Sequence, residues 1–479
     1  MTFDQILAKI DDFVWGVPLI VLILAAGLLL TIRTGFIQVR HLPRALRYLF
    51  KEEVNEEEEI VHGEVSGFAS LCTALSATIG TGNIVGVATA VGILAGGPGA
   101  LFWMWMAAFL GMATKYSEGF LAVKYRTVDE DGHVLGGPFY YIEKGMGVKW
   151  KWLAKIFAFF GACVGLMGIG TFSQVNGIAS AVTGFFDPNM TNTITLFGSD
   201  YSIVTVISAF VLAILAGLVI IGGLKRISSV SQVVVPFMAI LYVLTVVVLI
   251  ICNITKLPAA IAEVVTSAFG AKAMAGGALG AVLISMKNGI ARGIFSNESG
   301  LGSAPIAAAA AKTKEPVRQG LISMTGTFID TIIICTMTGL AIVMAGSWKD
   351  EALQGVQITT DAFQKGLHFL PSQAASFILM ICLVFFAFTT ILGWDYYGER
   401  CLEYLSGKNK TAVMIYRILY IAAVFIGPYM TVSAVWTIAD IFNGLMALPN
   451  LVALFALSGV VTKDTKDYFK RLNAGEIKE

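Results

Sequence analysis

The hydrophobic pattern of the chain predicts a series of membrane-spanning helices joined by short polar loops. Apolar runs of roughly 20 residues recur along the sequence, and a helix of about that length crosses the hydrocarbon core of a bilayer. Eleven spans can be placed, near residues 15–32, 67–95, 99–124, 152–186, 202–223, 229–253, 276–305, 318–346, 372–400, 411–428 and 432–460. The pattern therefore predicts an all-α integral membrane protein.

Two of these spans are interrupted near the middle. The span at 67–95 carries glycine and short polar residues at 74–86, and the span at 276–305 is interrupted over residues 287–300, where Gly289 and Gly293 lie among polar residues. Glycine is a poor helix former, and freed backbone groups cannot stay unpaired in hydrocarbon. Glycine also serves ordinary helix packing in membranes. Two broken spans in corresponding halves of a chain nevertheless favour a transporter binding site.

The order of the spans indicates an internal repeat. After the first span, five helices are followed by five more, and a broken helix opens each set. An odd number of helices per set forces the second set to enter the membrane from the opposite side. This predicts an inverted repeat with a site at the bilayer midplane. The expected parts are an N-terminal helix with its linker, two repeats and a tail, at residues 1–64, 65–255, 270–462 and 463–479.

Composition and charge agree with this prediction. Hydrophobic residues make up 56% of the chain and charged residues 14%, against about 25% charged residues in soluble domains. A net charge of +1 argues against a nucleic-acid partner. Basic residues cluster at 33–51, after the first span, and short basic loops stay cytoplasmic. We expect a multi-pass protein of the inner (plasma) membrane with an extracellular N-terminus and a cytoplasmic C-terminus.

Metal and signal-peptide patterns are absent from the sequence. The four His and six scattered Cys form no CxxC or HExxH motif, so no zinc, haem or disulfide framework is indicated. The N-terminus lacks a basic region followed by a cleavage site, so we expect no removable signal peptide.

The first break offers groups for both ends of a zwitterion. Backbone N–H groups around Thr81, Gly82 and Asn83 begin a half-helix, whose positive dipole end suits a carboxylate. The carbonyls that end the preceding half-helix, around Ser76 to Ile79, suit a small cation or an ammonium group. The break could bind a zwitterion, or a carboxylate together with an ion. The alternative is a kink lined by small residues for helix packing.

Other spans carry further uncharged candidates. Asn288 lies beside Gly289 in the second interrupted span. Gln174 is a lone amide in an apolar helix and could contact a substrate or a neighbouring helix. Thr389 and Thr390 offer adjacent hydroxyls, hard ligands that suit sodium, although such threonines usually bond to their own helix backbone.

Charged residues inside spans have a different expected role. Arg292 and Glu298 are costly in a membrane unless paired or facing water, so we expect them to be gating or structural partners near the cytoplasmic end. Lys287 lies nearer the midplane and has no clear role. Asp330 and Asp395 could carry protons, and Asp440 lies late in the last span; we expect all three to pair within the protein.

Four motifs resemble one transporter family. They are Gly-Gly-Pro-Gly-Ala-Leu-Phe-Trp-Met-Trp-Met at 96–106, the segment 295–305, Thr-Ile-Gly-Thr-Gly-Asn at 78–83, and Gly393-Trp394. The chain resembles the alanine/glycine:cation symporters, also called sodium:alanine symporters, over essentially its whole length. The resemblance implies a LeuT-like 5+5 inverted repeat with one extra N-terminal transmembrane helix. It also implies alanine and glycine as substrates and a sodium gradient as the driving force.

The resemblance assigns roles to particular residues. The implied substrate-binding residues are Thr78, Thr81, Gly82, Asn83, Gln174, Asn288, Gly289, Ile290 and Phe295. The implied sodium ligands are the carbonyls of Ser76, Ile79 and Phe386 and the hydroxyls of Thr389 and Thr390. Asn83 also lies where some relatives complete a second sodium site, but here Ala77 replaces an amide found nearby in LeuT-like amino-acid transporters.

The sequence thus predicts a monomeric secondary transporter that imports small neutral amino acids with sodium by alternating access. A proton-coupled transporter acting through Asp330 or Asp395 is the main alternative, and sodium dependence at fixed pH distinguishes the two. A channel is less favoured, because the broken helices would meet at one closed site. No HExxH, GxSxG or paired-aspartate motif supports an enzyme.

Overall fold

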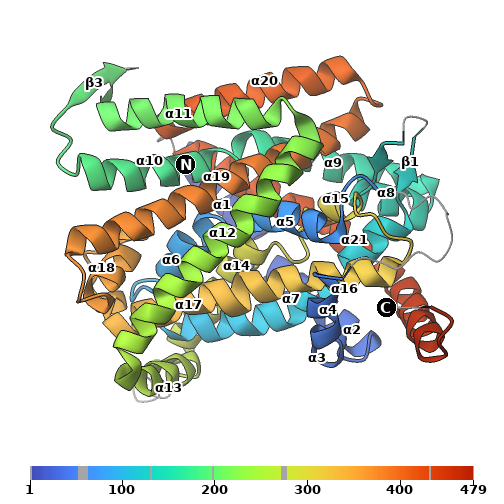
Figure 1. The fold of residues 1–479 in the computed structure, drawn as a ribbon, viewed down its shortest axis with the longest axis horizontal. Helices are drawn as coiled ribbons and strands as arrows, with labels where there is room; N and C mark the ends of the chain where they lie inside the picture. The colour runs from blue at the N-terminus through green and yellow to red at the C-terminus, as the bar shows by residue number, and fades with distance from the viewer. Residues whose placement is uncertain are drawn as a thin grey trace.

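The chain folds almost entirely into helices (Figure 1). The computed structural model describes residues 3–51, 63–129, 132–196, 199–270, 278–430 and 433–477. Two antiparallel hairpins interrupt the helices, formed by β1 (Thr127–Val128) with β2 (Val134–Leu135), and by β3 (Thr193–Leu196) with β4 (Ser199–Ser202). The predicted all-α class is therefore confirmed apart from these short hairpins.

Long apolar helices form the body of the molecule. They are α2 (Val17–Arg33), α7 (Gly99–Lys124), α9 (Lys151–Met167), α10 (Phe172–Phe186), α11 (Ile203–Ile220), α12 (Gly223–Cys252), α14 (Ala278–Asn297), α19 (Ser372–Leu405), α20 (Lys410–Ile426) and α21 (Ser433–Asn473). A further long segment consists of α16 (Pro316–Thr327) and α17 (Thr336–Ala345), joined by the π-helical segment Phe328–Cys335. In the described part of the chain, eight helical segments are long and apolar enough to cross a membrane, or nine if one bent pair counts as a span.

Shorter helices connect or flank these segments. They are α1 (Phe3–Val14), α3 (Ile37–Arg40), α4 (Leu42–Tyr48), α8 (Pro138–Tyr140), α13 (Leu257–Ala268) and α18 (Val356–Gly366). In Figure 1, α5 (Gly67–Thr78) and α14 lie in the interior, α12 crosses in front of them, and α10, α11 and α20 form one edge.

The first predicted break is confirmed. Helix α5 (Gly67–Thr78) ends at Thr78, and a π-helical turn (Gly82–Gly86) followed by α6 (Val87–Val91) continues at an angle of 54°. Gly80 lies between the two parts. A Cβ there would come within 2.5 Å of the Thr390 hydroxyl and 2.9 Å of the Gln174 amide oxygen. Only glycine fits this close approach.

The second break lies later in the chain than the glycines predict. Helix α14 continues unbroken through Gly289 and Gly293 to Asn297. The break follows at 298–303, where Glu298 has φ +56° and two glycines have positive φ, before α15 (Ala304–Ala308). Gly289 instead permits close helix packing, because a Cβ there would lie 2.9 Å from the Cβ of Trp103 on α7.

The two broken helices are enclosed by long unbroken ones. Helix α7 packs along both α14 and α16, while α19 packs against α5, α9 and α10. Helix α21 contains Pro449 and packs against α9, α2 and α1. This enclosure buries the polar residues of both breaks inside the protein.

Candidate functional site

A cavity of about 420 Å³ opens at the first break. Its walls come from the π-helical turn with α6, from α10, from α14, and from the beginning of α21. Its polar lining residues are Thr81, Thr89, Ser173, Asn176, Ser180, Arg292 and Asp440. Gly82 and Phe295 also line it, so the cavity reaches the backbone where a carboxylate was expected.

Two side-chain amides hold the backbone of the break. The Gly80 N–H donates to Asn83 Oδ1 at 2.9 Å, and the Thr81 N–H donates to Gln174 Oε1 at 3.0 Å. Gln174 is fixed in turn by donating from Nε2 to the Ile169 carbonyl at 3.0 Å. One predicted carboxylate donor, the Thr81 amide, is therefore already bonded to Gln174 in this conformation. A ligand carboxylate would have to take that bond over or bind at the neighbouring amides.

Asp330 connects the first break to the second broken helix. Its Oδ1 accepts a hydrogen bond from Asn83 Nδ2 at 2.6 Å. Its Oδ2 accepts from the hydroxyls of Ser296 at 3.0 Å and Thr331 at 2.7 Å. All four residues are buried. Asp330 thus pairs within the protein as expected, and it joins segments from three different helices.

Asp395 does not follow the same expectation. It is fully buried in α19, and neither carboxyl oxygen has a hydrogen-bond partner among the residues that the structure describes. The prediction that Asp395 pairs within the protein is therefore wrong for this conformation.

Most of the predicted sodium ligands come together beside the first break. The Thr390 hydroxyl lies 3.2 Å from the Ile79 carbonyl oxygen and 3.0 Å from that of Phe386. The Thr389 hydroxyl donates to the same Phe386 carbonyl at 3.0 Å. These are hard, uncharged oxygen donors in a buried place, the kind of ligand set that suits sodium. Among the described residues, the Thr389 hydroxyl bonds only within its own helix and to the Met238 sulfur, whereas the Thr390 hydroxyl also reaches the Ile79 carbonyl at the break.

Ser76, the remaining predicted sodium ligand, lies in α5. Its hydroxyl donates to the Thr73 carbonyl at 2.7 Å. The hydroxyl is thus engaged within the helix, and the backbone carbonyl of Ser76 remains the predicted ligand.

Several predicted substrate residues lie away from the large cavity. Asn288 donates to the Ala95 carbonyl, Gly289 packs on α7, and Ile290 is buried in the hydrophobic core. Thr78 lines a separate, much smaller cavity. The structure therefore brings Thr81, Gly82 and Phe295 to the large cavity, with Asn83 and Gln174 supporting the break behind it.

Other cavity residues were missed by the sequence prediction or were given another role. Ser173, Asn176 and Ser180 recur at intervals of three and four residues, so they form one polar face of α10. That spacing is a signal the sequence offers. Arg292 was expected to be a gating or structural partner; it lines the large cavity with Asp440, and its guanidinium lies 5.5 Å from the ring centre of Phe295.

These features define the class of protein. A helical membrane protein with broken helices at a central cavity, and an oxygen ligand set beside the break, is a secondary transporter and not an enzyme. The fold is similar to that of the crystal structure of MhsT in complex with L-phenylalanine, with a TM-score of 0.54 and 11% identity over 84% of this chain and 98% of that one.

The chain belongs to the sodium:alanine symporter family, whose model matches residues 1–479. It is 45% identical to the sodium/alanine symporter AgcS of Methanococcus maripaludis, over the whole of both chains. It is 55% identical to an uncharacterized transporter of Haemophilus influenzae, over 98% of this chain and 97% of that one. The protein is accordingly a multi-pass, sodium-coupled amino-acid symporter with a LeuT-like fold.

Proposed function

We propose that the protein imports alanine and glycine together with sodium by alternating access. The contact between the Thr390 hydroxyl and the Ile79 carbonyl is the observation that carries the proposal. It brings the oxygen donors of α19 against the first break. The residues that follow this break, Thr81 and Gly82, line the large cavity. Ion binding and substrate binding would then act on the same short piece of backbone.

The proposed coupling follows from this shared backbone. Sodium would be held by the carbonyls of Ile79, Phe386 and Ser76 and by the hydroxyls of Thr389 and Thr390. Fixing the Ile79 carbonyl would also fix the orientation of the amides at Thr81 and Gly82 that we propose for the carboxylate. Because coupling between two binding sites is reciprocal, alanine should raise the affinity for sodium as much as sodium raises the affinity for alanine.

The small size of the proposed substrate rests on the family and on the surroundings of Gly82, not on the volume of the whole cavity, which at about 420 Å³ exceeds that of alanine. A Cβ on Gly82 would meet the Phe295 ring at 3.5 Å, an ordinary van der Waals distance, so the ring borders the break directly. We infer that the Phe295 ring would limit the substrate side chain once the cavity closes around a carboxylate held at Gly82.

The proposed architecture has eleven spans in a monomer. Helix α2 would be the additional N-terminal span. The region 65–255, from α5 to α12, and the region 270–462, from α14 into α21, would be the two inverted repeats. The basic stretch after α2 supports an extracellular N-terminus and a cytoplasmic C-terminus.

Uptake of labelled alanine into proteoliposomes tests the function. An inward sodium gradient at equal pH on both sides should drive accumulation, and replacing sodium with choline should abolish it. Accumulation that follows a proton gradient without sodium would contradict the proposal. It would favour the alternative in which Asp330 or the unpaired carboxyl of Asp395 carries a proton.

Competition by other amino acids tests the proposed substrate size. Unlabelled glycine should compete with alanine about as well as alanine itself. Leucine should compete poorly, because overpacking a rigid site typically costs about 1–3 kcal/mol. Equal competition by leucine would contradict the proposed pocket.

A further inference from the structure

Lys115 is a buried cation that the proposed transport mechanism does not use. It lies in the middle of α7, its side chain is 3% exposed, and its Nζ has no hydrogen-bond partner among the described residues. A buried charge without a partner is costly, and ionisable residues within membrane spans are usually functional. The position of this ammonium group therefore needs an explanation.

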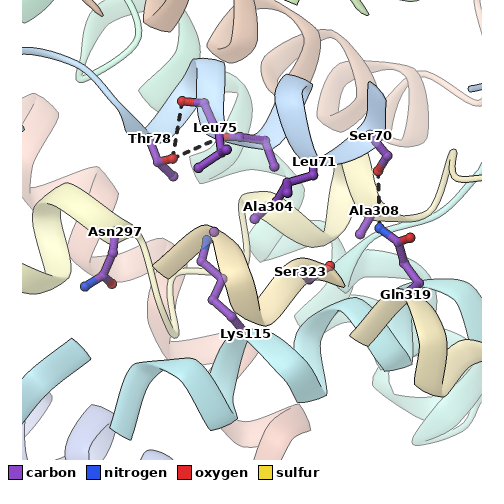
Figure 2. Close-up of a pocket in the computed structure, with 12 residues that line it drawn as sticks. Ser70, Leu71, Leu75, Thr78, Lys115, Asn297, Ala304, Ala308, Gln319 and Ser323 are labelled. Carbon is purple, nitrogen blue, oxygen red and sulfur yellow. Dashed lines mark hydrogen bonds between the residues drawn. The ribbon is translucent and has the colours of Figure 1, made fainter. Parts of the chain in front are cut away.

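The ammonium group points into a second cavity, separate from the large one. This cavity has a volume of about 20 Å³, which is too small for an amino acid. Figure 2 shows Lys115 rising from α7 toward α5, with Asn297 on one side and Ser323 and Gln319 of α16 on the other.

The ends of two half-helices meet at this small cavity. Thr78 is the last residue of α5 and Asn297 the last residue of α14, and both line it. The C-terminal end of a helix carries roughly half a negative charge on its unpaired carbonyl groups. The Lys115 ammonium thus lies where two such negative ends converge.

The carboxylates around Lys115 have hydrogen-bond donors of their own. Glu118, Glu298 and Asp330 are the acidic residues whose charges act on the ammonium. Glu298 accepts from Trp394 Nε1 at 2.9 Å and from Ser303 at 2.5 Å, and Glu118 accepts from Asn450 Nδ2 at 2.7 Å. None of them forms an ion pair with Lys115 within the described part of the chain. The positive charge of Lys115 is therefore offset by the combined negative charge of these carboxylates and of the two helix C-terminal ends, and not by a single ion pair.

The two cavities lie on opposite sides of the breaks. The large cavity is lined by residues after the first break and by α14 before the second. The small cavity is lined by α5 before the first break and by α15 after the second, together with α7, α16 and the last residue of α14. Helices α5 and α15 are tied together, since the Ser70 hydroxyl donates to the Ala307 carbonyl at 2.9 Å and the Glu64 N–H to the Ala310 carbonyl at 2.8 Å. Lys115 thus lies on the side where α5 and α15 are tied together, which is called the closed side below.

We propose that Lys115 is a tethered cation that holds α5 and α15 closed against α7, and so sets how often this side of the transporter opens. It is a positioning residue, in contact with neither substrate nor sodium. This inference rests on the proposed alternating-access function, in which the side closed here must open once per cycle. Removing the charge would weaken the closed arrangement and leave the large cavity intact.

Thiol labelling of Cys72 tests the proposal without any transport measurement. Cys72 lies in α5 and is 1% exposed, so it should react only when α5 moves away. The experiment uses the full-length protein in lipid vesicles, with Cys163, Cys252, Cys335, Cys382 and Cys401 replaced by alanine. A maleimide is added to the solution that faces the closed side, where α5 and α15 are tied together. Alanine and sodium are left out, so the result does not depend on whether the proposed substrate is correct.

Lys115→Met and Lys115→Gln should label at least tenfold faster than the parent chain. Lys115→Arg keeps the charge and should stay within about threefold of the parent rate. Lys124→Met is the matched control, because Lys124 ends the same helix at the surface beside Asp464, and it should label at the parent rate.

Three results would overturn the proposal. One is a parent-like labelling rate in folded Lys115→Met or Lys115→Gln. Another is fast labelling of Lys115→Arg, which would show that side-chain shape matters and charge does not. The third is loss of folded protein in both neutral variants while Lys115→Arg assembles, because the charge would then serve the fold itself and not the gate.

Discussion

Thr389 and Thr390 are neighbours in sequence with different surroundings. Both hydroxyls donate to the Phe386 carbonyl, but only Thr390 also lies within 3.2 Å of the Ile79 carbonyl at the break. The adjacent hydroxyls were visible in the sequence as a candidate sodium site. Which one reaches the break was not, because that depends on how α19 is rotated against α5.

Thr390→Val should raise the sodium concentration for half-maximal alanine uptake by roughly 5- to 150-fold. This range corresponds to about 1–3 kcal/mol, the cost of stranding a buried polar partner. The measurement is uptake against sodium concentration at saturating alanine. Thr245→Val is the control, since Thr245 bonds to its own helix backbone at Leu241 and lies outside the site. An unchanged sodium dependence in an active Thr390→Val protein would remove Thr390 from the ligand set.

Arg292 requires a sharper test than the sequence suggested, because it lines the same cavity as Gly82. If the backbone amides bind the carboxylate, Arg292→Gln should still prefer alanine over alaninamide. Competition by both compounds against labelled alanine measures this preference. If Arg292→Gln takes up both equally, the guanidinium and not the helix end recognises the carboxylate.

At the scale of elements, the structure shows which sequence signals were reliable. The first break was predicted because glycine and polar residues coincide within one apolar run. The second was misplaced because Gly289 serves close packing on α7, while the real break begins at Glu298 with a left-handed residue. Glycine alone does not distinguish these uses, since both need the absence of a Cβ.

Lys115 could have been noticed as a lone cation within an apolar run, but its surroundings come from α5, α14 and α16 and depend on tertiary packing.

An ion-pair cluster outside the membrane spans joins the chain before α5 to the end of α19. His133 lies 2.7 Å from Glu64 and 3.6 Å from Glu403. Hydrogen bonds to Glu403 and Glu64 raise the pKa of His133 to about 9, although burial and the nearby Arg400 guanidinium oppose its charge. Glu64 lies just before α5, and its N–H bonds to the Ala310 carbonyl. The cluster therefore stabilises the side of the molecule where α5 and α15 are tied together.

The charged His133 should make the protein less stable in alkali. The pKa of His133 is raised above the value of about 6.5 that it has in the unfolded chain. Its contribution to the free energy of unfolding is therefore fully present below pH 6.5 and is lost as the pH rises through about 9. We expect a loss on the order of 1–2 kcal/mol between pH 7 and pH 10, allowing for solvent screening. Thermal unfolding of the wild type and of His133→Gln at both pH values measures it. His133→Gln should lose this part of the pH dependence, and an identical dependence in both proteins would show that His133 is uncharged at pH 7.

At the scale of the whole molecule, the hydrophobic pattern predicted the class correctly, and the family supplied the fold. The pattern is strong because every backbone group in a bilayer needs a partner within the chain, which leaves long apolar helices as the solution here. The repeat, the number of spans and the orientation remain predictions.

Reporter fusions test the orientation. A reporter before residue 1 should lie outside the cell, and one after residue 479 should lie in the cytoplasm. Alkaline phosphatase activity at the N-terminus and fluorescence of a cytoplasmic reporter at the C-terminus measure this. Two cytoplasmic termini would contradict the eleven-span arrangement.

Helix α21 has a mechanical consequence for how the transporter could be observed. It continues for 41 residues, which is about 62 Å of helix and twice the thickness of a hydrocarbon core of about 30 Å. Asn450, next to Pro449, holds the second break by donating to the Gly300 carbonyl at 2.9 Å. Beyond this bond the helix is tied to α7 and to the chain before α16, since the Tyr116 and Thr465 hydroxyls lie 2.7 Å apart and Arg471 pairs with Glu315 at 3.1 Å. A spectroscopic label near the C-terminal end of α21 would thus report, in water, whether these ties hold or break when the second break rearranges.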